Sequence, residues 1–482
     1  MSDFTKVNLT KKTLTGVQWS AIEHFFNQLV TFVIGVILAR LLSPHDFGLV
    51  GMLSVFLYVA QSLVDSGFSN ALIRKKNRTH VDCSTVFYFN VAVGIIMVAI
   101  MYFLAPFIGS FFKTSELVDI TRVTAIVLFI NSLSVVQIAL FTANLDFKTQ
   151  AKGSVLSNFL GGLVGVFLAY AGHGVWALVW QSLTTASIKC VLLWCYSHWF
   201  PSLVFSYKSF VELFSFGSKL MISSIINSLY SQAASILIGR FYTPSDLAYY
   251  NRGSNFAHLP SSTFSSVIQR VTFPLLAQIQ EDKSRLIDVY RKYIKLSSLI
   301  MFFVLLLLAS LAKPIILTLL TEEWEPAVVY LQLFSLSVMT SHFAQINMNL
   351  LQVEGRSDLC LRIEIVKKVI ALGLMLLAVP HGVLIMCLSV VLYSPISLYL
   401  NTYYTGKLYK LGIKEQIGDC LPYLVKSFIA CIPSFILTFT SIPNLLVLVL
   451  GTIVSCVLYY FFLRKDQLFI TYILESLKKK KK

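Results

Sequence analysis

The chain has 482 residues, of which 56% are hydrophobic and only 13% are charged. A soluble domain is about half apolar and about a quarter charged, so this composition excludes an ordinary soluble enzyme and favours a chain that lies in lipid. The net charge of +16 would suggest nucleic acid as a partner of a soluble protein. Here lysine and arginine lie in alternate loops, a pattern that is explained by the topology of a membrane protein. We therefore expect no nucleic acid partner.

Apolar runs of about 20 residues or more recur from end to end of the chain, which is the length that spans a bilayer. The runs are continuously apolar rather than alternating, which favours helices over a β-barrel. We therefore predict an all-α integral membrane protein with about fourteen transmembrane helices. In chain order the expected spans are 17–42, 47–70, 84–110, 118–143, 150–171, 174–198, 213–240, 246–275, 293–319, 326–352, 358–379, 383–405, 421–440 and 445–463.

The loops between these spans alternate in charge. One set carries most of the cations, such as Arg74, Lys75, Lys76 and Arg78, whereas the other set offers short segments such as SPHD, GHG and TEEWEP, with Lys113 as its one clear cation. Positively charged loops stay in the cytoplasm, so both termini are expected to be cytoplasmic. The lysine run at 478–482 either contacts anionic headgroups of membrane lipids or is a solvated tail.

A short motif occurs twice. The stretch ARLLSPHDFG starts at Ala39, and GRFYTPSDLA starts at Gly239 with arginine, proline and aspartate at matching places. Each copy lies near the start of a block of six helices, and because six is even the two blocks run in the same sense. Parallel repeats predict a pseudo-twofold axis along the membrane normal and a substrate path between the blocks. We expect three parts: a lobe at 1–212, a second lobe at 213–410, and two extra helices with a basic tail at 411–482.

The repeated motif has a structural and a functional interpretation. In the structural one, each proline ends a helix, Asp46 and Asp246 cap the next helix, and Arg40 and Arg240 lie in the last turn at the negative end of the helix dipole. In the functional one, the two arginines line the outer mouth of a cavity.

Ionisable side chains at bilayer depth are costly and usually face a cavity or a partner. Clear cations within the expected spans outnumber acids, and a cavity lined by cations suits an anion, most naturally a phosphate. The alternative is structural, because a pair such as Glu364 and Lys368 neutralises itself at a spacing of four residues. Asp65 and Glu23 are candidates for ion coupling. The candidate substrate-binding residues are Arg252, Arg270, Lys367, Lys368, Arg362, Arg240 and Arg40, with Asn255 and Gln345 as polar contacts.

Motifs of other chemistry are missing from the sequence. It contains no P-loop, no G-x-S-x-G elbow and no H-E-x-x-H, and its eight cysteines form no C-x-x-C pair. We therefore expect no cofactor, no metal, no disulfide and no enzyme activity, and we interpret the chain as a secondary transporter. Two rivals are a multidrug exporter coupled to cations or protons, which would need acidic cavity residues, and a membrane-embedded polymerase or ligase, which would need a large outer loop.

Resemblance to a known family rests on four segments: ARLLSPHDFGLVGM, LVDSGFSNALIRKKN, GRFYTPSDLAYYNRG and TFPLLAQIQED. They resemble the bacterial polysaccharide exporters related to the colanic acid exporter, within the multidrug/oligosaccharidyl-lipid/polysaccharide (MOP) exporter superfamily. The resemblance implies two six-helix lobes in a V that open alternately to the two sides of the bacterial inner membrane. It implies a cargo of oligosaccharide on undecaprenyl diphosphate, such as a repeat unit of O-antigen, exopolysaccharide or capsule. H+ or Na+ is the candidate counter-ion, and polysaccharide polymerase or export machinery is a candidate contact.

Overall fold

The computed structural model describes residues 25–471, except the side chains at 266, 267, 270 and 271. Every regular element in this part of the chain is a helix. Ten of the described helices are long and apolar enough to cross a membrane, or eleven if Leu117–Ser132 and Val135–Ala143, bent by 40°, form one span. The all-α membrane class is therefore confirmed, whereas the count of fourteen spans stays a prediction. The chain divides into two compact units, Met1–Ala248 and Tyr249–Lys482.

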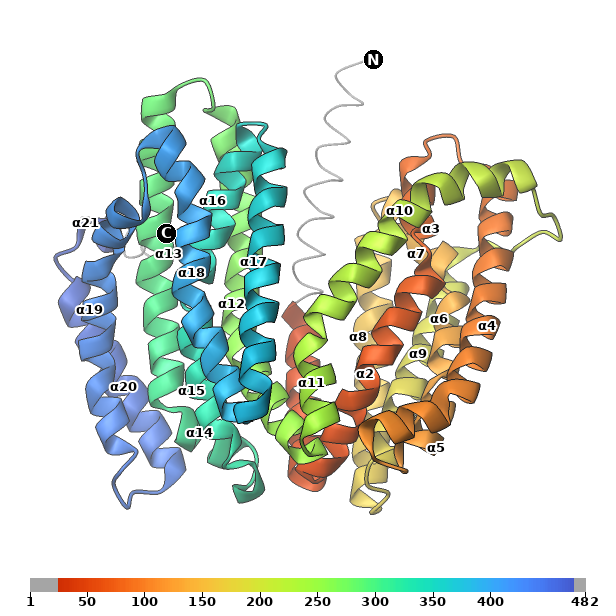
Figure 1. Ribbon diagram of the computed structural model, residues 1–482, viewed down its shortest axis with the longest axis horizontal. Helices are drawn as coiled ribbons and strands as arrows, with labels where there is room; N and C mark the ends of the chain where they lie inside the picture. Colours follow the sequence, from red (N-terminus) through yellow and green to blue (C-terminus); the bar gives the residue numbers. More distant parts are fainter. Residues whose placement is uncertain (1–24, 472–482) are drawn as a thin grey trace, which may run out of the picture. The chain divides into compact units, whose positions relative to one another are not determined.

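The N-terminal unit runs from red to green in Figure 1. Helix α8 packs along α9, α4 packs on α5 and α6, and α10 lies across α2 and α3. Its described helices are Phe25–Leu41, α2 (Pro44–Asp65), α3 (Phe68–Arg74), α4 (His80–Phe112), α5 (Leu117–Thr124), α6 (Ile126–Ser132), α7 (Val135–Ala143), α8 (Phe147–Tyr170), α9 (Trp176–Ser197), α10 (Tyr207–Ser231) and α11 (Ala233–Phe241).

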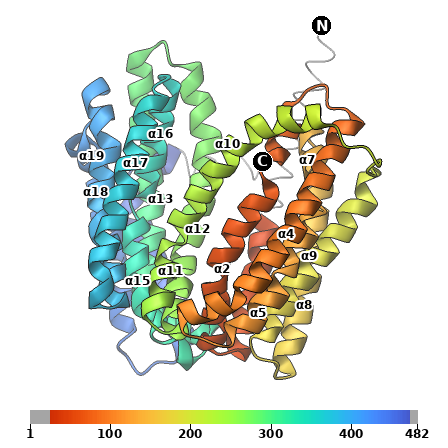
Figure 2. The same ribbon diagram turned by 45° about the vertical axis from the view of Figure 1, so that its right-hand side comes forward.

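The C-terminal unit follows from green to blue, and α12 (Pro244–Gln278) carries the chain into it. Helix α17 lies beside α18 in both views (Figure 2). The last long pair, α19 and α20, packs on α13 and α14. The elements after α12 are α13 (Lys283–Ser310), α14 (Ala312–Leu319), η1 (Glu322–Trp324), α15 (Ala327–Val338), α16 (Ser341–Val353), α17 (Ser357–Ala378), η2 (Val379–His381), α18 (Val383–Tyr409), α19 (Ile413–Leu437), α20 (Asn444–Leu463) and α21 (Gln467–Phe469).

Several apolar runs that hydropathy joins into one span are broken in the structure. The run at 118–143 forms α5, α6 and α7, the run at 213–240 forms α10 and α11, and the run at 326–352 forms α15 and α16. Each break spans only one to a few residues, so it hardly changes the average hydropathy of the run. A break nevertheless releases backbone groups from the helical ladder, which must find other partners in a membrane.

The repeated motif begins a helix in both copies, and the capping residue is not the predicted aspartate. Ser43 caps α2 because its Oγ accepts from the Asp46 amide at 3.3 Å, while the Asp46 carboxylate accepts from the Ser43 amide at 3.1 Å. Thr243 and Asp246 repeat this capping box at 3.2 and 3.1 Å. The prediction that Asp46 and Asp246 are the caps was therefore wrong. Each proline takes the first helical position, where its missing N–H costs nothing, and each aspartate comes third.

Two glycines let α10 cross the break between α2 and α3 at backbone contact. Gly67 begins α3 with φ +69°, a left-handed conformation that a side chain disfavours. A Cβ at Gly67 would lie 2.2 Å from the carbonyl oxygen of Gly217 on α10. Both the backbone conformation and the lack of space therefore require glycine at position 67.

The substitution Gly67→Ala is expected to destabilise the protein more than Gly172→Ala. Both glycines have positive φ, but a Cβ at Gly172 has no heavy atom within 4 Å. Strain alone should cost about 1–2 kcal/mol in each variant, and only Gly67→Ala must also push α10 away. Thermal unfolding in detergent, followed by size-exclusion chromatography, measures the two losses. Equal losses would show that the contact between Gly67 and Gly217 is not tight.

Candidate functional site

A polar cavity of about 410 Å³ lies within the N-terminal unit. Its walls come from α2, α3, α6, α7, α9 and α10, so no single helix makes it. Most of the side chains that line it carry an amide, a hydroxyl or a charge, although the helices themselves are apolar. The lining residues are Gln61, Ser62, Asp65, Gly67, Ser69, Asn70, Asn131, Ser134, Val135, Ile138, Ala186, Lys189, Leu220, Met221 and Ser224.

A hydrogen-bonded row of side chains runs along one wall of this cavity. Asn131 Nδ2 donates to Gln61 Oε1 at 2.9 Å, and Gln61 Nε2 donates to Asp65 Oδ1 at 3.1 Å. The spacing of four residues places Gln61 and Asp65 on the same face of α2, as the sequence indicated. Asn131 reaches them from α6, close to the point where that helix ends and α7 begins. The row therefore fixes the orientation of the Asp65 carboxylate, which is exposed to the cavity.

The charges of the cavity nearly cancel. Asp65 is the one acid and Lys189 the one base among its lining residues. The remaining polar groups are amides and hydroxyls, which both donate and accept hydrogen bonds. Such a lining suits a neutral ligand with many hydroxyl groups better than a multiply charged anion, which would need more cations.

Serine hydroxyls hold the α10 wall of the cavity against α2. Ser62 Oγ lies 3.2 Å from Ser228 Oγ, and the Ser224 hydroxyl donates to Ser62 at 3.2 Å. Small side chains let the two helices approach closely, which is how helices commonly associate in a membrane. The cavity wall is thus closed by short polar contacts rather than by bulky side chains.

Of the two ion-coupling candidates, Asp65 lies in the cavity, and Glu23 lies outside the described residues. The two motif arginines have different surroundings. Arg40 is exposed near the end of the helix Phe25–Leu41. Arg240 is half-buried, and its Nη1 donates to the carbonyl of Phe111 at 2.5 Å in the last turn of α4. The Arg240 contact is the one expected of a cation at a helix C-terminus.

In the C-terminal unit, two candidates lie on α12. The guanidinium of Arg252 lies over the ring of Trp324, 4.9 Å from its centroid, and Trp324 is fully buried in η1. Asn255, one turn further along α12, is exposed. Arg270 is also on α12, but its side chain is outside the described residues.

The candidates on α16 and α17 are half-buried or exposed. Lys367 donates to Glu364 at 2.6 Å, so the structure pairs this glutamate with Lys367, where the sequence suggested Lys368. Lys368 is half-buried and Arg362 is exposed. On α16, the Gln345 amide donates to Asn349 at 3.1 Å. Substrate contact by these residues and by those on α12 stays a prediction.

Sequence reasoning missed the uncharged half of the cavity. Asn70, Asn131, Ser134 and Ser224 were not among the predicted site residues, although the structure places them around Asp65. A signal was present in the stretch INSLS at 130–134, where three polar residues interrupt an apolar run. That interruption matches the break between α6 and α7, and it identifies polar groups that must be satisfied inside the membrane.

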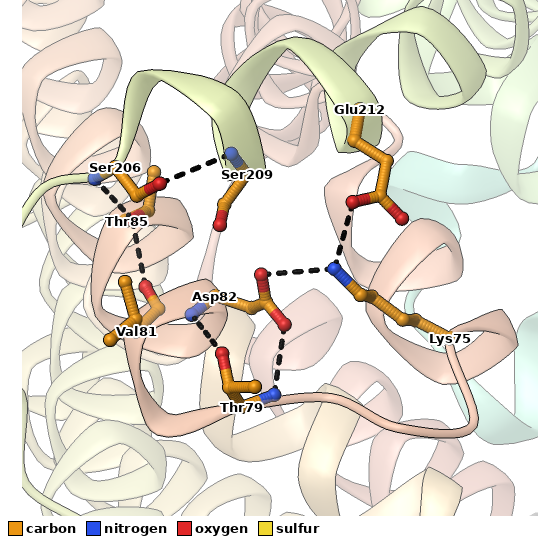
Figure 3. Close-up of polar contacts among 8 residues, drawn as sticks. All are labelled: Lys75, Thr79, Val81, Asp82, Thr85, Ser206, Ser209 and Glu212. Carbon is orange, nitrogen blue, oxygen red and sulfur yellow. Dashed lines mark hydrogen bonds and ion pairs between the residues drawn. The ribbon is translucent and has the colours of Figure 1, made fainter.

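A second polar cluster joins the turn between α3 and α4 to the first turns of α10 (Figure 3). Lys75 Nζ lies 3.1 Å from Asp82 and 3.0 Å from Glu212. Asp82 also completes a capping box with Thr79, whose amide donates to the carboxylate at 2.8 Å. The backbone amide of Ser206, which caps α10, donates to Thr85 on α4 at 3.0 Å. The cluster therefore fixes the start of α10, whose later turns form a wall of the cavity.

The charge of Lys75 is stable in this cluster. Burial lowers the pKa of Lys75, but its hydrogen bonds to Glu212 and Asp82 outweigh burial and hold the pKa above its usual value of 10.5. A lysine with a raised folded-state pKa stabilises the fold fully below its unfolded pKa, and this contribution is lost only as pH rises through the folded value. The cluster should therefore be unaffected by pH between about 7 and 9.

Asp82→Ala is expected to lower the free energy of unfolding by about 2–3 kcal/mol, because it removes the carboxylate of the Thr79 capping box and leaves Lys75 without its buried partner. Glu212→Ala is the matched control, since its carboxylate is 57% exposed and an exposed ion pair contributes at most about 1 kcal/mol. Thermal unfolding of both variants at pH 7 and pH 9 measures these effects. A larger loss of stability in Glu212→Ala would show that the ion pair between Lys75 and Glu212 stabilises the fold more than the contacts of Asp82 do.

Comparison with known proteins places the chain among polysaccharide biosynthesis proteins. The profile of the family described as "Polysaccharide biosynthesis protein" matches residues 37–329, which is more than half of the chain. The teichuronic acid biosynthesis protein TuaB of Bacillus subtilis is 25% identical over 73% of this chain and 73% of its own length. The succinoglycan biosynthesis transport protein ExoT of Rhizobium meliloti is 26% identical over 68% of this chain and 66% of its own.

Two solved structures have the same fold. The lipid II flippase MurJ in an inward closed conformation aligns with a TM-score of 0.74 at 13% identity, covering 92% of this chain and 98% of MurJ. An inward-facing MATE family multidrug transporter of the MOP superfamily aligns with a TM-score of 0.62 at 16% identity, covering 80% of this chain and 96% of the transporter. The chain is thus a multi-pass membrane protein with the fold of MOP transporters, and it belongs to the polysaccharide biosynthesis protein family.

Proposed function

We propose that this protein is a flippase that moves an oligosaccharide linked to undecaprenyl diphosphate from the cytoplasmic to the periplasmic leaflet. The observation that carries the proposal is the nearly neutral cavity of amides and hydroxyls inside the apolar N-terminal unit. A volume of about 410 Å³ lies in the range of small-ligand sites and has room for a sugar residue. The name of ExoT as a transport protein and that of MurJ as a flippase agree with this function.

The physical task is to carry a polar headgroup across a layer of hydrocarbon. A diphosphate and its sugars cannot cross about 30 Å of hydrocarbon unaided, because their polar groups would lose their hydrogen bonds. The polyprenyl tail is apolar and never needs to leave the lipid. The protein therefore has to replace water only around the headgroup, which the amides and hydroxyls around Asp65 can do for its sugars.

The proposed arrangement has fourteen spans, with both termini in the cytoplasm of the bacterial inner membrane. Two parallel six-helix lobes, at 1–212 and 213–410, open alternately to the two sides, and the part at 411–482 adds two helices. The alternation of charge between loops supports the orientation. The capping boxes of Ser43 and Thr243 contain the same pair of hydrogen bonds, which supports a duplication of the six-helix lobe.

The diphosphate is proposed to contact cations outside the neutral cavity, with Arg252 and Lys367 as the first candidates. The guanidinium of Arg252 lies over the ring of Trp324, and a guanidinium is the side chain that forms the strongest paired hydrogen bonds with a phosphate. An inside-negative potential favours outward movement of the anion by about 2.3 kcal/mol per charge per 100 mV. Coupling to H+ or Na+ through Asp65 or Glu23 is a further source of free energy.

Two other functions fit less well. A multidrug exporter of this fold would hold cationic drugs with acidic groups, but the cavity contains one acid and one base. A polymerase or ligase would need catalytic residues on a large outer loop, and the outer segments, such as TEEWEP, are short. The relatives that are named as transporters support a transporter without enzyme activity.

Replacing Asn131 by leucine should lower export at least about tenfold, because it removes a cavity amide and leaves Gln61 without its donor. Asn158→Leu is the matched control, since Asn158 donates an equivalent amide hydrogen bond to Asn27 at 3.0 Å outside the cavity. Each variant is expressed in cells that lack the chain, and the lipid-linked oligosaccharide that accumulates inside is quantified. Normal export by Asn131→Leu, or an equal loss of export in both variants, would show that the cavity is not part of the transport path.

Arg252→Ala and Lys367→Ala should each abolish export while the protein stays in the membrane, since a diphosphate needs cationic donors. Arg252→Lys keeps the charge and should retain part of the activity. Immunoblots of the membrane fraction distinguish loss of transport from loss of protein. Normal export by both alanine variants would exclude these two residues from the diphosphate site.

A further inference from the structure

An apolar groove of about 540 Å³ lies on α4 and α6 of the N-terminal unit, apart from the polar cavity. Its walls contain no charged side chain, and Tyr102 contributes the one hydroxyl. Beside the groove, α4 also exposes Ile96, Ile100 and Phe107, so this face of the helix is turned toward the surrounding lipid. The residues that line the groove are Ile95, Val98, Ala99, Tyr102, Phe103, Ile126 and Phe129.

A cation lies at one end of this groove. The guanidinium of Arg122, in the last turn of α5, lies over the ring of Tyr102 at 4.7 Å from its centroid. Its Nε is buried and has no hydrogen-bond partner in the part of the chain that the structure describes. Its Nη1 lies 3.6 Å from Asp119, which is too long for a hydrogen bond, and that carboxylate is 74% exposed. Arg122, whose side chain is partly exposed, thus lacks a hydrogen-bonded anion among the described residues.

We propose that this groove binds one anionic glycerophospholipid, with its phosphate on Arg122 and one acyl chain between α4 and α6. The two parts of the site match the two parts of such a lipid. A guanidinium forms strong, paired hydrogen bonds with a phosphate, and the apolar walls accept hydrocarbon. A sugar or a free phosphate would leave the groove unfilled, and a plain hydrocarbon would leave Arg122 unsatisfied.

The dimensions agree with one leaflet. From Ile95 to Phe103 the groove follows eight residues of α4, or about 12 Å along its axis. One leaflet contributes about 15 Å to the hydrocarbon thickness. Arg122 lies beside Tyr102, ten residues before the end of α4, so a headgroup on Arg122 lies at one end of the groove and its acyl chain follows α4 toward Ile95.

Native mass spectrometry of the full-length protein in detergent tests the site, with phosphatidylglycerol and phosphatidylcholine as probes. The wild type should retain one phosphatidylglycerol molecule that stays bound under the collisional activation that removes the detergent. R122Q should bind it at least about tenfold more weakly, because a charge-assisted hydrogen bond is lost. A99W should lose the same molecule, because the indole fills the groove while the headgroup contact remains.

Two controls separate this site from general lipid contact. K113Q removes a cation at the end of α4, and I96W introduces the same indole on the exposed face of α4 outside the groove; both should bind as the wild type does. Unchanged binding by R122Q and A99W, or equal loss in K113Q, overturns the proposal. Equal retention of phosphatidylcholine by the wild type overturns the anionic preference. Because the assay measures lipid and not export, its result is independent of the flippase proposal.

Discussion

Hydrocarbon offers no hydrogen bonds, and the rest of this structure depends on that constraint. Every polar group inside the membrane needs a partner within the protein or a water-filled space beside it. The chain nevertheless carries amides, hydroxyls and charges along most of its apolar helices. Two polar networks, one in each compact unit, meet the constraint in different ways.

In the C-terminal unit four polar side chains close a network on themselves. Tyr290 donates to Asn347 at 2.8 Å, Thr405 donates to the same oxygen at 2.6 Å, and Asn347 donates to Gln416 at 3.0 Å. All four side chains are buried, and they fasten α13, α16, α18 and α19 together. A network that satisfies all its members specifies one packing of the helices and leaves nothing to offer a substrate.

In the N-terminal unit the corresponding row stays open. Asn131, Gln61 and Asp65 bond in sequence, and the carboxylate at the end faces a cavity. The cavity exists because helices that hydropathy joins are broken, at 133–134 between α6 and α7 and at Ser66 and Gly67 between α2 and α3. Glycine at position 67 also brings α10 close enough for its serines to form a wall. Helix breaks and backbone contact thus create the polar space that a headgroup needs.

The sequence by itself determined the all-α membrane class, the shared face of Gln61 and Asp65, and the equal motifs at the starts of α2 and α12. These features follow from composition, from helical periodicity and from contacts between residues close in the chain, all of which a sequence displays directly. Only the tertiary structure decided that Asn131 of α6 reaches Gln61 and, through Gln61, Asp65 of α2. The choices of Ser43 as the cap and of Lys367 as the partner of Glu364 are local, and the sequence offered a second residue close by for each. The site candidates chosen by charge lie mostly on α12 and α17, whereas the cavity is assembled from six helices and, apart from Asp65 and Lys189, from uncharged groups. Hydropathy measures how costly each residue is in lipid, but the partner that removes this cost comes from a distant part of the chain, and folding alone selects it.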